Sequence, residues 1–155
     1  MLNVTRRILV SAPRDSVRKY LSDLREIANY EPKVSSIEIA EPAEGVSGRD
    51  ASAEGRFLGL PWRGTFRFEM TSDGGYHGVM VHGPLRRMEM RMVLRPVIGG
   101  TVIEHDETYE LPLLLRPLNA MIRRWLDKTL ENELDFIKEG AEGLNRRLQL
   151  QRLDV

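Results

Sequence analysis

The sequence predicts an α+β fold in which one antiparallel sheet wraps around a single long C-terminal helix. Two observations predict it. Between residues 49 and 111, segments of alternating apolar and polar residues follow one another with turn residues between them, which is typical of antiparallel strands. From Pro117 to about Leu148, apolar residues recur at helical spacing instead. So long and apolar a helix needs a large concave partner, which the strands supply.

The order of elements supports this architecture. A first strand (residues 2–10) precedes two short helices (14–22 and 23–29). Six further strands are expected at 34–39, 49–58, 62–71, 76–82, 85–95 and 101–111. No repeat, low-complexity segment or linker interrupts the 155 residues, so we expect one domain spanning residues 1–155.

The final helix carries two apolar stripes, and Pro117 suits its first turn because that position needs no N–H. The first stripe consists of Leu118, Ile122, Trp125, Thr129, Glu133, Phe136 and Gly140, and the second of Leu130, Leu134, Ile137, Ala141, Leu144 and Leu148. The second stripe suits either a core flank or a seam between two copies, so both a monomer and a homodimer remain open. Gly140 and Gly143 each cost about 1 kcal/mol in a helix interior and predict a bend or fraying.

Composition excludes several classes of function. The chain has 23 basic and 23 acidic residues, so no net charge favours nucleic acid. It has no Cys, and neither a signal-peptide core nor a membrane-length apolar run is present, which predicts a cytoplasmic protein. His77 and His82 fall on opposite faces of a strand, and no phosphate-binding glycine loop occurs. We therefore expect no metal and no cofactor.

The opening of the chain carries a family resemblance. Ser11-Ala12-Pro13 follows the first strand, Tyr20-Leu21-Ser22-Asp23 ends the first helix, and Tyr30-Glu31-Pro32-Lys33-Val34 leads into the next strand. With the Gly99-Gly100-Thr101 turn and the final helix, these segments resemble the START-like helix-grip superfamily. That superfamily includes birch-pollen-allergen-type proteins and the polyketide cyclase/dehydrase and lipid-transport group. The resemblance covers nearly the whole chain and implies an apolar cavity between sheet and helix for a lipid, sterol, quinone or polyketide.

Strand alternation and the helix stripe identify the side chains that face this interior. The candidate ligand-binding residues are Phe57, Phe66, Phe68, Met88, Met90, Met92, Ile103, His105, Glu107, Tyr109, Ile122, Trp125, Thr129 and Glu133. The methionines either line an adaptable pocket or fill an ordinary core. Ala51, Ala53 and Gly55 face the same interior and leave room for a ligand.

The inner face of the last strand carries candidate catalytic residues. His105, Glu107 and Tyr109 alternate with outward residues, and a histidine, a carboxylate and a phenol in an apolar pocket suit acid–base chemistry on a carbonyl substrate. In a structural alternative, Arg6 of the adjacent first strand and Glu107 form an internal ion pair. We expect Arg6 to be the principal partner of Glu107 in either case.

The segment Leu111-Pro112-Leu113-Leu114-Leu115 is an apolar loop without charge. It either forms a mobile rim, with transient membrane contact through Leu113, Leu114 and Leu115, or packs against the first helices. Three functions are compatible with the sequence: a carrier of a hydrophobic small molecule, a polyketide cyclase/dehydrase-type enzyme, and a quinone- or lipid-handling partner of a membrane enzyme.

Overall fold

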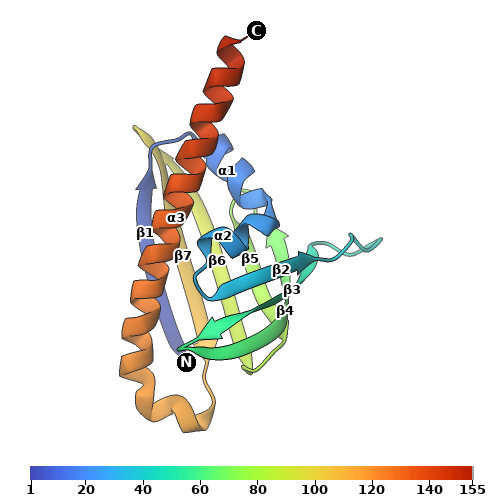
Figure 1. Ribbon diagram of the computed structural model, residues 1–155, viewed down its shortest axis with the longest axis vertical. Helices are drawn as coiled ribbons and strands as arrows, with labels where there is room; N and C mark the ends of the chain where they lie inside the picture. The colour runs from blue at the N-terminus through green and yellow to red at the C-terminus, as the bar shows by residue number, and fades with distance from the viewer. Residues whose placement is uncertain (155) are drawn as a thin grey trace.

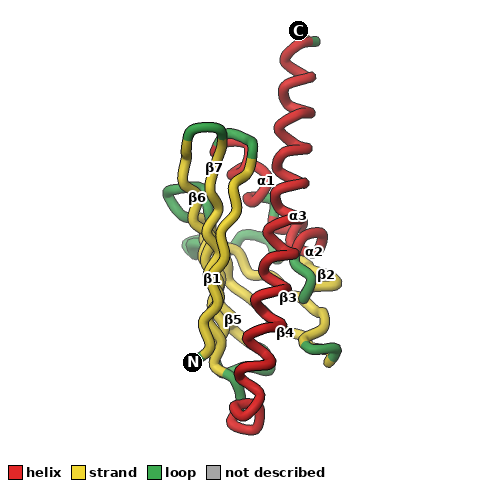
Figure 2. The backbone as a smooth tube through the Cα atoms, turned by 90° about the vertical axis from the view of Figure 1, so that its left-hand side faces the viewer, coloured by secondary structure: helices red, strands yellow, loops and turns green. Residues whose placement is uncertain are grey.

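The computed structural model describes residues 1–154 and shows a seven-stranded antiparallel sheet curving around one long helix (Figures 1 and 2). The strands are β1 (Leu2–Val10), β2 (Val34–Ile39), β3 (Arg49–Phe57), β4 (Leu60–Met70), β5 (Tyr76–His82), β6 (Arg87–Val97) and β7 (Gly100–Glu110). Their order in the sheet is β1-β7-β6-β5-β4-β3-β2, so β1 and β2 form its edges. The predicted α+β architecture is confirmed, and the observed strand ends lie within two residues of those expected.

The helices occupy the concave side of the sheet (Figure 2). They are α1 (Arg14–Ser22), the 3-10 helix η1 (Leu24–Glu26), α2 (Ile27–Tyr30), the 3-10 helix η2 (Leu113–Leu118) and α3 (Asn119–Leu153). The last helix begins later than predicted, because Pro117 lies in η2, and it ends at Leu153 instead of near Leu148.

Strand β7 shows how the sheet divides buried from exposed side chains. Thr101, Ile103, His105, Glu107 and Tyr109 are all buried, and the residues between them are half-buried. This is the inner face that the sequence alternation predicted. The inner face packs on the α3 residues Ile122, Leu126, Leu130, Leu134 and Ile137, each at most 2% exposed.

The prediction that α3 frays near Gly140 is wrong, because the helix continues to Leu153. A Cβ at Gly140 would lie only 2.2 Å from the hydroxyl oxygen of Tyr20 in α1. Gly140 therefore lets α1 pack closely on α3. The contact is extended by Ser16, whose hydroxyl donates to the side-chain oxygen of Asn145 at 2.9 Å.

The apolar loop before α3 does not pack against the first helices as the alternative interpretation proposed. Leu111 is buried and Leu115 is half-buried, but Leu113 and Leu114 are 66% and 91% exposed. The segment Leu113–Leu118 forms η2 at the end of the molecule opposite the C-terminus (Figure 1). Within the described residues, no helix has the combination of length and apolar composition that crossing a membrane requires.

Candidate functional site

A group of charged and polar side chains lies buried between the sheet and α3. This buried polar cluster consists of Glu31, Lys33, His105, Glu107, Tyr109 and Glu133. At its centre, the Lys33 ammonium donates to Oε1 of Glu107 at 3.2 Å, and the Tyr109 hydroxyl donates to Oε2 of the same carboxylate. The Lys33 ammonium also lies 2.9 Å from Oε1 of Glu31. The charge of Glu107 is thus compensated inside the protein, as a buried charge requires.

The predicted pairing of Arg6 with Glu107 is wrong. Arg6 lies opposite His105 in the β1–β7 register, but β1 is an edge strand. Its long side chain therefore leaves the interior around the sheet edge, where its guanidinium lies 3.8 Å from the carboxylate of Asp127 on α3. Both side chains are exposed to water, so this pair does not belong to the cluster.

Lys33 is also held in place through its backbone. Its carbonyl oxygen accepts a hydrogen bond from the Trp62 indole N–H at 3.0 Å and another from the Arg56 backbone N–H at 3.2 Å. A Cβ at Gly55 would lie 1.8 Å from that carbonyl oxygen. Gly55 therefore admits the Lys33 backbone and leaves no space there for a ligand.

The charges around Lys33 fix its ionisation state. Burial alone would lower the pKa of Lys33, but the carboxylates of Glu107 and Glu31 outweigh burial and hold it well above its ordinary value. Burial, followed by the charge of Glu107, raises the pKa of Tyr109 well above its ordinary value. Both groups thus remain proton donors at neutral pH.

His105 lies between two carboxylates without a hydrogen bond to either. Its Nε2 is 3.6 Å from Oε1 of Glu107 and its Nδ1 is 3.4 Å from Oε1 of Glu133. Neither imidazole nitrogen has a hydrogen-bond partner among the described residues. Burial lowers the pKa of His105 to about 4, so the imidazole is neutral at pH 7.

Glu133 of α3 closes the cluster on the helix side. Burial, and then the charge of Glu31, raises the pKa of Glu133 well above its ordinary value. Single ligand atoms of His105, Glu107 and Glu133 lie within 4.8 Å of one another, so the fold assembles three potential metal ligands that are not neighbours in sequence. The Lys33 ammonium already compensates the charge of Glu107, one of these three groups.

An apolar pocket of about 220 Å³ adjoins the cluster. It is lined by Lys33, Phe57, Leu60, Pro61, Trp62, Phe66, Met80, Pro84, Leu85, Met88, Tyr109, Pro112 and Leu115. Lys33 and Tyr109 are therefore shared between the pocket wall and the cluster. The pocket lies where the β3–β4 turn, the β5–β6 turn and the segment after β7 meet, and α3 contributes none of these lining residues.

The predicted ligand-binding residues divide into three groups. Phe57, Phe66, Met88 and Tyr109 line the apolar pocket. His105, Glu107 and Glu133 belong to the buried polar cluster, with Thr129 buried on the same face of α3. The others lie elsewhere: Met92, Ile103 and Ile122 are fully buried in the core, Met90 is half-buried, Trp125 packs edge-on against Phe57, and Phe68 lines a second hollow. The α3 residues among these predictions do not line the apolar pocket, which lies at the end of the sheet.

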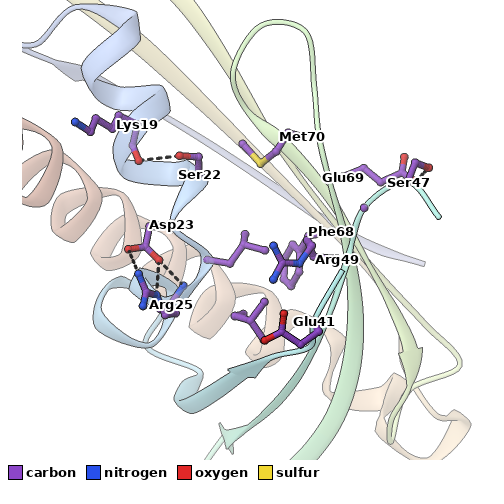
Figure 3. A pocket seen from close by; sticks show the side chains of 13 residues that line it. Lys19, Ser22, Asp23, Arg25, Glu41, Ser47, Arg49, Phe68, Glu69 and Met70 are labelled. Atoms are coloured by element: carbon purple, nitrogen blue, oxygen red, sulfur yellow. Dashed lines mark hydrogen bonds and ion pairs between the residues drawn. The ribbon is translucent and has the colours of Figure 1, made fainter. Parts of the chain in front are cut away.

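The second hollow is larger, about 1090 Å³, and lies between the α1–η1 segment and strands β2 to β4 (Figure 3). Its wall mixes both signs of charge, and several of the charged side chains already have a polar partner. Arg25 donates to the Asp23 carboxylate at 3.0 Å, and Arg49 donates to the Ala40 carbonyl oxygen at 3.0 Å. A broad surface with charges of both signs is a poor binding site for an apolar molecule, so the smaller pocket is the candidate site.

Comparison with known proteins identifies the family of this chain. Over residues 1–142 the sequence matches the family described as polyketide cyclase / dehydrase and lipid transport. The chain belongs to this family. Comparison with curated protein sequences gave no match.

Solved structures show the same START-like helix-grip fold. A Thermus thermophilus protein, TTHA0849, is 20% identical, with a TM-score of 0.79 over 90% of this chain and 96% of its own. A START superfamily protein from Mycobacterium smegmatis is 15% identical, with a TM-score of 0.69 over 94% and 98% of the two chains. The ZhuI aromatase/cyclase from Streptomyces sp. R1128 is 17% identical, with a TM-score of 0.66 over 94% and 93%. At these identities the similarity shows the fold alone.

Sequence reasoning missed Lys33 and Glu31 as members of the cluster. Both precede β2 in a short connection where no strand or helix period indicates which side chains point inward. One signal was present: Lys33 is one of only four lysines in a chain with 19 arginines.

Proposed function

We propose that the protein binds an apolar small molecule in the 220 Å³ pocket, with one polar acceptor group of that molecule directed to Lys33. The supporting observation is the composition of the pocket wall. Apart from Lys33, Tyr109 and the Trp62 indole, its described lining is entirely apolar. Such a wall favours a ligand that is hydrophobic over most of its surface and accepts a hydrogen bond at one end.

Lys33 has capacity for this acceptor. An ammonium has three N–H donors, and the carboxylates of Glu31 and Glu107 engage two of them. The third donor is available to a carbonyl or hydroxyl oxygen in the pocket. Because the volume is below the roughly 300–1,000 Å³ of typical ligand pockets, the pocket suits a ring system, a short acyl chain or the end of a longer molecule.

A binding protein is supported over a cyclase/dehydrase because the pocket wall lacks a base. Lys33 and Tyr109 are proton donors, and no carboxylate or imidazole is among the described lining residues. His105 and Glu133 lie behind the wall, fully or almost fully buried. Acid–base chemistry needs a base within hydrogen-bond reach of the substrate. One observation favours the enzyme hypothesis. The neutral imidazole of His105 lies close to Glu107, and Glu107 in turn accepts a hydrogen bond from Tyr109 in the pocket wall.

Filling the pocket tests the proposal. Met80→Trp places an indole in the pocket from β5, and the matched control Val81→Trp adds the same group at the exposed neighbouring residue. We expect 1-anilinonaphthalene-8-sulfonate to bind the wild type and Val81→Trp equally, and Met80→Trp at least about tenfold more weakly, with both variants retaining the wild-type circular dichroism spectrum. Equal binding to all three proteins would contradict the assignment of the pocket.

A matched pair of probes tests the polar end of the site. 1-Acetylnaphthalene carries a carbonyl oxygen that 1-ethylnaphthalene lacks, and quenching of tryptophan fluorescence reports binding because Trp62 lines the pocket. One added hydrogen bond predicts about fivefold tighter binding of the acetyl probe. The double variant Lys33→Met with Glu107→Gln should remove this preference without weakening the ethyl probe. Tyr109→Phe should leave the preference intact, because the Tyr109 hydroxyl donates to Glu107. An unchanged preference in the double variant would exclude Lys33 as the donor to the ligand.

A further inference from the structure

The end of the molecule at which the pocket lies also carries an exposed apolar surface. Leu113 and Leu114 of η2, Leu118 at its end, and Met121 in the first turn of α3 are 66%, 91%, 43% and 51% exposed. Single exposed leucines are common on protein surfaces, but four large apolar side chains within nine residues form a patch. We call these four residues the apolar tip.

The charge around the apolar tip has a single sign. Residues 111–126 include Arg116, Arg123 and Arg124 and no acidic residue, although the whole chain is formally neutral. The acids that flank this segment already face arginines: Glu110 lies 3.9 Å from Arg86, and Asp127 lies 3.8 Å from Arg6. The three positive charges are therefore not neutralised within their own segment.

We propose that the apolar tip and these arginines form a docking surface for an anionic lipid bilayer. Apolar side chains that enter the acyl boundary, together with basic residues that meet acidic headgroups, are the features of reversible interfacial binding. The charge complementarity favours a membrane that contains acidic lipid over a neutral one. It also favours a lipid surface over a protein partner, because the segment offers charge of one sign only and no acidic residue for a partner's cations.

The position of this surface connects it with the pocket. Pro112 and Leu115 line the pocket, and Leu113 and Leu114, which lie between them in the chain, are exposed to solvent. Docking through the apolar tip thus brings the pocket to the bilayer, where apolar molecules dissolve. The proposal of a docking surface depends only on the residues of the apolar tip and the neighbouring arginines. The further step, transfer of a ligand between the bilayer and the pocket, rests on the function proposed above.

Vesicle flotation tests the docking surface without any pocket ligand. The vesicles are phosphatidylcholine alone, or phosphatidylcholine with phosphatidylglycerol. We expect the wild type to bind the anionic vesicles, to bind neutral ones more weakly, and to dissociate as salt rises. Leu113→Asp with Leu114→Asp should reduce binding to anionic vesicles at least about tenfold, and so should Arg116→Glu with Arg124→Glu.

The far end of α3 supplies matched controls. Leu150 and Leu153 are 61% and 80% exposed there, and Arg146 and Arg152 are exposed as well. Leu150→Asp with Leu153→Asp, and Arg146→Glu with Arg152→Glu, should leave vesicle binding unchanged. The pocket-filled Met80→Trp protein should also bind vesicles normally, so failure of the pocket and failure of the docking surface give different results.

Three outcomes would overturn the proposal: no binding of the wild type to anionic vesicles, equal binding by the tip variants, or equal loss in the far-end controls. Sedimentation velocity adds a fourth. If the tip mutations abolish self-association in solution and leave vesicle binding intact, the patch is an interface between copies of this chain.

Discussion

The two faces of β7 carry similar residues in opposite surroundings. On the inner face, His105 and Glu107 are fully buried, and Glu107 depends on Lys33 from a distant connection. On the outer face, Glu104 pairs with Arg7 of β1 and with Arg95 of β6, whose side chains are both exposed. Water and salt screen the outer pair, whereas nothing but protein compensates the inner one. The same residue type is therefore a minor contributor on one face and a strong constraint on the other.

The largest expected effect comes from removing the inner cation. Lys33→Met leaves the buried carboxylates of Glu107 and Glu31 without their shared partner, and it should lower the free energy of unfolding by about 3–5 kcal/mol in urea denaturation. Adding Glu107→Gln should restore part of this loss, because the second change removes one of the two unpaired charges. If Lys33→Met is as stable as the wild type, the cluster is not compensated as described.

The next effect is a pH dependence produced by His105. Its pKa of about 4 lies below the ordinary value of 6.5, so between these pH values the unfolded chain binds the proton that the folded protein excludes. Stability should therefore be complete above pH 6.5 and decrease as pH falls toward 4, by up to about 3 kcal/mol from this group.

Comparing the unfolding free energy of the wild type with that of His105→Gln isolates the contribution of His105. This comparison is needed because Glu133 changes stability with pH in the opposite direction. The raised pKa of Glu133 favours the folded state at low pH, and this contribution is lost as pH rises above 4.5. The difference in unfolding free energy between wild type and variant should thus narrow from pH 7 to pH 4. Parallel stability curves for the two proteins would show that His105 does not carry the effect.

Two glycines of α3, Gly140 and Gly143, show a similar contrast between a crowded and an open position. Substituting them should change stability by an intermediate amount. Gly140→Ala forces a methyl group against the Tyr20 hydroxyl and should cost about 1–3 kcal/mol. At Gly143 the nearest atoms to an added Cβ are arginine nitrogens at 3.6 and 3.8 Å, so Gly143→Ala should stabilise by up to about 1 kcal/mol. Thermal unfolding of the two variants gives the sign directly, and equal shifts would contradict the close approach of α1 to α3.

The smallest effect is expected on the outer face of β7. Arg7→Met removes one of the two arginine partners of Glu104 and leaves Arg95 at 3.7 Å. Because the Arg7 side chain is 65% exposed, the free energy of unfolding should change by less than about 1 kcal/mol. A loss as large as that of Lys33→Met would remove the distinction between the two faces.

The sequence predicted the parts of this structure that depend on local periodicity. Alternation along β7 indicated that His105, Glu107 and Tyr109 share an inner face, and the helix stripe brought Glu133 toward them. The partner of Glu107 was not predictable in this way. Arg6 has the correct strand parity, but an edge strand lets a long side chain reach water. Lys33 lies outside any period and is placed by contacts with Gly55 and Trp62, which only the folded chain forms.

The pocket was predictable in kind but not in position. Inward methionines and small residues suggested space along α3, yet Gly55 accommodates the Lys33 backbone, and Met92 is fully buried in the core. The pocket forms instead where three connecting segments meet. These segments are far apart in the sequence, so no local pattern indicates that they come together.

Native mass spectrometry of protein isolated gently from its own host tests the central claim most directly. The wild type should carry a non-covalent apolar molecule that organic solvent extracts, and Met80→Trp, purified in parallel, should not carry it, because its indole occupies the pocket. The same adduct on both proteins, or none on the wild type, would contradict the claim that this pocket is the ligand site.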